Sequence, residues 1–293
     1  LYFFFLSPYI LTLEIEVDGI LDEKEWSQAK EITKYYESLP FTLNDASGSQ
    51  KVLVLEDEDG IYFGFINFQD EETIRVQKHQ RDDEMANADM VGVSIDFDGD
   101  GLLSYGFSIS AGGSILDNVV RNENEVNYDW DSDWGHGVSI GKDVWYAEMF
   151  IPWSVAPMKA QKGDKRRVRL SFYRWLVSEY IVRSTIKGNA MTEKFISIFN
   201  EYEFNNYDVS KIDYFPYVNL SEDRILEEDR TKVGAEIFWK IDAGKQLNVA
   251  INPDFGQVES DELVVNFDSS ETFYPDKRPF FSENHSLFDV KGF

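Results

Sequence analysis

Short runs of alternating apolar and polar residues recur along most of this chain, with turn-forming residues between them. The clearest runs occupy residues 51–56, 61–68, 90–97, 103–110, 144–151 and 167–176. The turns at 57–60 and 98–101 are acidic and contain Asp-Gly, which favours tight hairpins. Many short strands with turn signals and little helix predict an all-β fold, an immunoglobulin-like or jelly-roll-like β-sandwich.

The first thirty residues predict one short strand and one short helix. Residues 14–20 alternate and end in Asp-Gly, as a strand entering a turn does. Asp22 followed by Glu25 resembles a capping box and predicts a helix over 23–30. Trp26 has helical spacing from Ala29, which favours a place in the core over contact with a ligand. Residues 1–13 are apolar but too short to span a bilayer, so they fit either the remnant of a signal peptide or a first strand.

The composition changes near 200–213, where Asn, Tyr, Glu and Asp dominate. We therefore divide the chain into residues 1–13, 14–205 and 206–293. The last part contains alternating runs at 214–220, 232–241 and 246–251. One face of 232–241 is small or polar and the other is apolar, which fits the wall of a membrane barrel or an ordinary half-buried hairpin.

Residues 251–281 combine several turn formers with one short apolar run, 263–267. Pro275 and Pro279 enclose Lys277-Arg278, a rare basic pair in this acidic chain. Because proline fixes its own φ and restricts the preceding residue, this segment predicts a shaped connector.

The chain is strongly acidic, with a formal net charge of −26. Such a surface repels nucleic acid and anionic headgroups, and it suits cations. The sequence contains no cysteine, which excludes disulfides, thiolate metal sites and cysteine catalysis.

A candidate calcium site lies in the turn that contains Asp96, Asp98 and Asp100. Alternating carboxylates can wrap their oxygens around a hard ion that needs six to eight ligands. The twelfth position of this loop is Phe107, whereas an EF-hand requires Glu there. A plain acidic hairpin turn is the alternative interpretation.

A candidate carbohydrate site lies between residues 121 and 134. Indole faces stack against sugar rings, and planar polar side chains hydrogen-bond the hydroxyls. The alternative is that one of the tryptophans fills the end of the sandwich. The residues that we assign to this site are Trp130, Trp134, Arg121, Asp131 and Asn127.

The chain contains the motifs VDG-x-LDE-x-x-W-x-x-A at 17–29, Arg81-Asp82, Asp89, Asp96, Trp130-Asp131-x-x-Trp134 and Trp145-x-x-Glu148-x-x-Ile151-Pro152. Their order resembles that found in family 9 carbohydrate-binding modules, so residues 14–200 resemble such a module. Residues 206–293, above all 252–259 and 273–281, resemble the start of a bacterial outer-membrane β-barrel that carries such a module at its N-terminus. The resemblance implies a DOMON-like sandwich, structural calcium and a sugar held between two tryptophans.

The leading interpretation is non-catalytic binding of an oligo- or polysaccharide at the Gram-negative cell envelope, with no nucleic-acid partner. The sandwich would be stabilised by calcium, attached to an incomplete barrel in the outer membrane, and exposed to the periplasm or the cell surface. A glycoside hydrolase of carbohydrate catabolism is one alternative, although 54 acidic residues always provide carboxylate pairs. A structural or transport component with a periplasmic plug or docking domain is the other.

Overall fold

The computed structural model describes residues 13–83, 87–207, 210–223, 228–242 and 245–252. The chain divides into two compact units, Leu1–Asp208 and Val209–Phe293, and each is described by itself. Residues 1–12 lie outside the described residues, and so does the predicted connector beyond Asn252. In the described part of the chain, no helix has the length and apolarity needed to cross a membrane.

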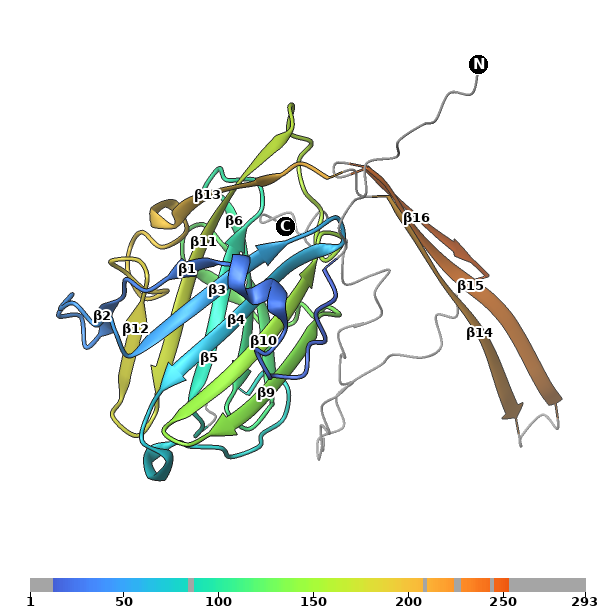
Figure 1. The fold of residues 1–293 in the computed structure, drawn as a ribbon. Coiled ribbons are helices and arrows are strands. Elements are labelled where there is room, and N and C mark those ends of the chain that lie inside the picture. Colours follow the sequence, from blue (N-terminus) through green and yellow to red (C-terminus); the bar gives the residue numbers. More distant parts are fainter. Residues whose placement is uncertain (1–12, 84–86, 208–209, 224–227, 243–244, 253–293) are drawn as a thin grey trace, which may run out of the picture. The chain divides into compact units, whose positions relative to one another are not determined.

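The first unit is a β-sandwich of two antiparallel sheets, which confirms the predicted fold class (Figure 1). The first sheet has the strand order β1-β3-β4-β10-β9: β1 (Lys30–Ile32), β3 (Gln50–Glu56), β4 (Gly60–Phe68), β10 (Val144–Pro152) and β9 (Gly135–Gly141). The second has the order β2-β12-β11-β5-β6-β7-β8: β2 (Tyr36–Leu39), β12 (Ile181–Ser184), β11 (Lys165–Leu176), β5 (Met90–Asp96), β6 (Leu103–Ser110), β7 (Ile115–Arg121) and β8 (Glu125–Asn127). A further strand, β13 (Asn200–Asn205), pairs with the first half of β11.

The two sheets meet through aromatic side chains on β4 and β11. Phe63 and Phe65 of β4 contact Phe172 of β11 edge-to-face, with ring centroids 5.5 and 6.1 Å apart. All three rings are buried. Because side chains alternate along a strand, this contact fixes which residues of each strand face the core.

The hairpins predicted from alternation are present. β3 pairs with β4 across residues 57–59, and β5 pairs with β6 across residues 97–102. Asp57 stabilises the first turn because its Oδ1 accepts hydrogen bonds from the backbone N–H groups of Asp59 and Gly60, at 3.0 and 3.2 Å. β9 and β10 form a further hairpin.

The N-terminal predictions are wrong in detail. Residues 14–20 form no strand, and the expected helix is a 3-10 helix, η1 (Lys24–Gln28), without a side-chain cap. The segment lies on the outer face of the first sheet, where Trp26 packs with Leu53 and Tyr62. Packing against the sheet therefore determines the conformation of this segment. Trp26 is buried, as predicted.

Glu148 of β10 holds this N-terminal segment on the sheet. Its Oε2 accepts hydrogen bonds from the N–H groups of Asp18 and Gly19 at 3.0 and 2.7 Å. Its neighbour on β9 is Gly137, where a Cβ would lie 2.4 Å from the carbonyl carbon of Asp18, so only glycine allows this approach. Burial, together with the negative charge of Glu23, raises the pKa of Glu148 to about 7.

The second unit contains a three-stranded antiparallel sheet of β14 (Lys211–Asp223), β15 (Glu228–Asp242) and β16 (Lys245–Ile251). The predicted alternation on β15 is confirmed, and the register aligns the apolar rows of all three strands. Ile237 pairs with Tyr214 on one side and with Val249 on the other. The exposed apolar side chains on this face, which we call the apolar face, are Ile212, Tyr214, Val218, Val233, Trp239, Leu247, Val249 and Ile251.

The raised pKa of Glu148 predicts a pH-dependent stability. Between about pH 4.5 and 7 the folded state binds this proton more strongly than the unfolded chain does, so the contribution of Glu148 to stability falls as the pH rises. We expect the difference in unfolding free energy between the native chain and Glu148→Gln to fall across this range, by at most about 1.4 kcal/mol per pH unit.

Urea denaturation at pH 5, 6, 7 and 8 measures that difference. Glu203→Gln, at an exposed position on β13, is the control and should differ from the native chain by the same amount at every pH. A pH-independent difference for Glu148→Gln would contradict the assignment.

Candidate functional site

Residues 128–134 pass from β8 in the second sheet to β9 in the first, and so close one edge of the sandwich. Trp130 packs on Tyr105 and Phe107 of β6, with ring centroids 4.9 and 5.9 Å apart. Trp134 packs edge-to-face on Phe107 at 5.6 Å. The two tryptophans therefore cover the inward side of β6 at the edge of the core.

Their exposure differs. Trp134 is 5% exposed, so little of its ring could stack against a ligand, and it fills the edge of the sandwich as the alternative interpretation allowed. Trp130 is half-buried, with one side of the ring on Tyr105. Of the two tryptophans assigned to the carbohydrate site, only Trp130 offers ring surface to solvent.

A buried carboxylate, Asp117 on β7, holds this loop in place. Both of its oxygens accept hydrogen bonds from Nη2 of Arg81 at 2.8 Å, and Oδ1 also accepts from Nε at 3.2 Å. Oδ2 accepts from the backbone N–H of Ser132 at 2.9 Å. Arg81 in turn donates to the carbonyl oxygen of Ser132 at 3.0 Å, so the ion pair and the loop form one unit.

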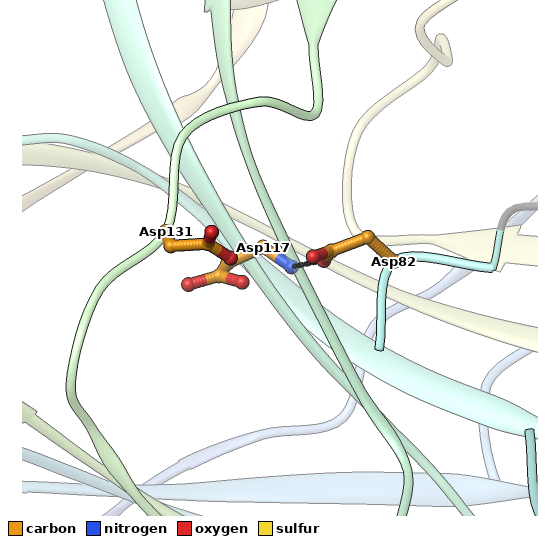
Figure 2. A group of neighbouring side chains, drawn as sticks. All are labelled: Asp82, Asp117 and Asp131. Atoms are coloured by element: carbon orange, nitrogen blue, oxygen red, sulfur yellow. Dashed lines mark hydrogen bonds between the residues drawn. The ribbon is translucent and has the colours of Figure 1, made fainter. Parts of the chain in front are cut away.

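Two further aspartates surround Asp117, and Figure 2 shows their carboxyl groups on either side of it. Asp82 accepts the backbone N–H of Asp117 at 3.0 Å, and Asp131 lies 2.9 Å from Nε of Arg81. One oxygen from each of Asp82, Asp117 and Asp131 falls within 4.8 Å of the others, which is the spacing of a metal-ligand set. The guanidinium of Arg81 contacts all three carboxylates and already supplies a cation there.

The electrostatics of this group agree with that arrangement. Burial and the negative charges of Asp117 and Asp131 raise the pKa of Asp82 to about 7. Burial alone would lower the pKa of Arg81, but the three carboxylates raise it, so the guanidinium stays charged. The group is an ion-pair network centred on Arg81, with one carboxyl that titrates near neutrality.

The remaining residues assigned to the carbohydrate site lie on or beside the β7–β8 hairpin. Arg121 is exposed at the end of β7, where its cross-strand neighbour is Glu125. Asn127 ends β8, and its Oδ1 accepts the N–H of Asp129 at 2.7 Å. The arginine that contacts Asp131 is therefore Arg81, and Arg121 belongs to the hairpin.

The predicted calcium turn is held by hydrogen bonds within the chain. Asp96 is buried, and its two oxygens accept from the N–H groups of Gly99 and Gly101, both at 2.8 Å. Both glycines have positive φ, as this tight turn requires. Asp98 and Asp100 face Lys159, whose Nζ lies 3.8 and 2.5 Å from their carboxylates. The calcium assignment stays a prediction.

Sequence reasoning missed the central role of Arg81 and Asp117. A signal for Asp117 was available, because an aspartate within the apolar strand 115–121 must find a cationic or N–H partner if it is buried. Arg81, 36 positions earlier in the chain, could not be identified as that partner without the fold.

Comparisons with known proteins give four findings. Residues 210–293 match a family model described as a domain of unknown function, DUF5916. Among solved structures, the chain is similar to a family 9 carbohydrate-binding module from Caldicellulosiruptor kristjanssonii in complex with cellotriose, at 10% identity and a TM-score of 0.45, covering 64% of this chain and 87% of that one. It is also similar to a putative carbohydrate-binding protein from Bacteroides uniformis, at 12% identity and a TM-score of 0.47, covering 61% and 88%. No curated protein matches the chain.

The ion pair predicts a large and specific loss of stability. Arg81→Met leaves the buried carboxylate of Asp117 without its charged partner, which costs roughly 3 kcal/mol of unfolding free energy. Adding Asp117→Asn to Arg81→Met should recover part of that loss, because the uncompensated charge is gone.

Chemical denaturation at pH 8 measures these differences. Lys159→Met is the control, since Lys159 is exposed and its partners Asp98 and Asp100 are partly exposed, so solvent screens the pair and its loss should change stability little. A loss for Arg81→Met no larger than that of the control would show that the pair is dispensable.

Proposed function

We propose that the β-sandwich binds an oligo- or polysaccharide without catalysis, at the surface beside Trp130. The observation that carries this proposal is the half-buried indole of Trp130, whose chain neighbour Asp131 is a partly exposed carboxylate paired with Arg81. The side chains of Arg81 and Asp131 are 40% and 43% exposed, while the ion-pair network holds them in position.

This arrangement has the chemistry that a sugar requires. An indole face stacks against the C–H face of a pyranose ring, and a guanidinium and a carboxylate hydrogen-bond neighbouring hydroxyls. Because Arg81 is fixed through Asp117 and Ser132, these groups lose little freedom on binding. Trp134 supports the loop from the core side, since its ring is buried against Phe107.

The same network gives little support to the hydrolase alternative. Glycoside hydrolysis uses two carboxyl groups about 5–10 Å apart across the scissile bond. Oxygens of Asp82, Asp117 and Asp131 converge within 4.8 Å, and Arg81 contacts all three carboxylates. A sugar bond could not be placed between them without displacing the guanidinium.

Calcium at residues 96–100 is part of the proposal. Asp98 and Asp100 would supply the ligands, and the ion would displace the ammonium of Lys159. Asp96 would keep its two backbone hydrogen bonds, because its oxygens already hold the turn.

We further propose that the second unit belongs to the wall of a membrane β-barrel, which places the protein in the outer membrane of the cell envelope. Support comes from the apolar face, on which Tyr214, Ile237 and Val249 stand in one cross-strand row. The opposite face is mixed, since it carries Glu236 and Asn248 together with Phe215 packed on Phe238. A membrane barrel alternates apolar residues toward lipid with polar residues toward its interior.

The carbohydrate proposal predicts that Trp130→Ala weakens binding at least tenfold, about 1.4 kcal/mol, because the stacking surface is lost. Calorimetry and tryptophan fluorescence against a panel of α- and β-linked oligosaccharides measure the effect. Trp175→Ala is the matched control, since Trp175 is also half-buried but lies on β11 beside Tyr180.

Each titration is run with calcium and with a chelator, which tests the calcium proposal at the same time. If the native chain binds no oligosaccharide under either condition, carbohydrate binding is wrong. Release of reducing sugar from a polysaccharide panel would favour the hydrolase.

The membrane proposal predicts that Val249→Lys reduces the fraction of the chain that floats with phosphatidylcholine liposomes. A lysine facing hydrocarbon costs about 2–4 kcal/mol, so we expect a loss of at least tenfold. Asn248→Lys, on the opposite face of the same strand, should float like the native chain. If Val249→Lys instead dissociates a dimer and leaves flotation unchanged, the apolar face binds a second copy of the chain.

A further inference from the structure

A layer of polar side chains crosses the otherwise apolar interior of the sandwich. Gln50, Asn67 and Trp145 are cross-strand neighbours on β3, β4 and β10. Because they are register partners, the three side chains lie on the same face of the sheet, and all are at least 97% buried. The next row along, Val52, Phe65 and Ala147, is apolar and contains the ring that meets Phe172.

Arg174 of the opposite sheet faces this layer. It stands two residues after Phe172 on β11, so it points to the same side, and it is fully buried. Its Nη1 donates to the carbonyl oxygens of Ser49 and Phe68 at 2.9 and 3.3 Å. These are the chain neighbours of Gln50 and Asn67, so the guanidinium lies at the level of the polar layer.

The hydrogen bonds of Arg174 go to neutral oxygens. Besides the two carbonyl groups, its Nη2 donates to Oε1 of Gln69 at 2.6 Å. Gln69 links Arg174 to the buried carboxylate of Asp89, which accepts a hydrogen bond from Nε2 of Gln69 at 2.7 Å. A second guanidinium, that of Arg183, donates to Oγ of Ser49 at 2.6 Å. Two guanidinium groups thus adjoin the layer against one buried carboxylate.

Four N–H donors in this layer have no hydrogen-bond partner among the residues that the structure describes. They are Nε of Arg174, Nε1 of Trp145, Nδ2 of Asn67 and Nε2 of Gln50. A buried donor without an acceptor loses its hydration and gains nothing in return, so four in one layer would destabilise the fold strongly if nothing accepted from them.

The geometry points to a binding site for a small monovalent anion of chloride size inside the sandwich, held by the N–H groups of Arg174, Trp145, Asn67 and Gln50. An anion only accepts hydrogen bonds, which fits four donors better than a neutral group that must also donate. Its charge would act on Arg174 together with those of Asp89 and Glu179, the carboxylates that already favour the charged guanidinium. Oε1 of Gln50 is also unpaired. The buried hydroxyl of Tyr35 belongs to the same layer, because it interacts with the side chain of Gln50 and with the charge of Arg174.

Ordered water is the competing occupant, because water can satisfy both the donors and Oε1 of Gln50. The two occupants differ in one measurable respect. A site for an anion makes stability depend on the concentration and identity of the anion, since a ligand of the folded state stabilises it in proportion to the logarithm of its occupancy. Water does not.

The test measures the thermal unfolding of the whole chain in sodium chloride, bromide and gluconate at equal ionic strength. We expect a saturable rise in Tm with chloride and bromide, and none with gluconate, which is too large. Trp145→Phe removes one donor and keeps an aromatic ring, so it should weaken the halide response several-fold.

Trp153→Phe is the matched control. Trp153 is equally buried, but its Nε1 donates to the carbonyl oxygen of Asp57 at 2.9 Å. This variant should lose stability and keep the full halide response. Arg174→Met should abolish the response, and if it does not fold, Trp145→Phe decides.

Crystals soaked in sodium bromide should show an anomalous peak within the layer. The proposal is overturned if Tm is the same in all three salts, or if Trp145→Phe and Trp153→Phe respond equally to halide. A bromide peak without any dependence of Tm on halide would mean binding at crystal concentration only, and would also overturn it.

Discussion

The packing of Phe65 against Phe172 is the contact on which the rest of the sandwich depends. It fixes the inward face of β4 and β11, and through the register it fixes the inward face of every neighbouring strand. Arg174 and Asn67 are buried because each stands two residues from one of these rings. A slip of one residue would expose both rings and leave the polar layer in solvent. The buried polar groups are thus a consequence of the same register that builds the apolar core.

Segments outside the sheets are held largely by buried carboxylates. Asp57, Asp89, Asp117 and Glu148 are all buried, and each accepts backbone N–H groups from turns or loops. A carboxylate buried in this way is stable only while its donors are present, since its desolvation is otherwise uncompensated. The strands therefore determine where the loops lie, and the loops in turn neutralise charges that the strands carry into the interior. This mutual dependence explains how an irregular segment such as 128–134 keeps a defined position.

Local patterns in the sequence predicted the hairpins and the alternation on β15, because turn residues and period-two alternation act over a few positions. They failed for residues 14–30, because the conformation of this segment depends on packing against β3, β4 and β10, which follow much later in the sequence. They also failed for the candidate site, because Arg81 meets Asp117 through tertiary packing. The burial of Trp134 shows the same limit. A tryptophan in a polar loop suggests exposure, but this loop crosses the edge of the sandwich and turns the ring inward.

The acidity of the chain and the apolar face of its second unit impose separate constraints. A net charge of −26 disfavours adsorption to anionic headgroups, because that contact is electrostatic and long-ranged. Insertion of strands depends instead on the uncharged row that faces the hydrocarbon, and Tyr214, Ile237 and Val249 form such a row. An acidic protein can therefore be excluded from the surface of a membrane and still cross it through strands. The charge argument from the sequence limits how this chain could meet lipid, and it leaves the barrel proposal to be decided by the apolar face.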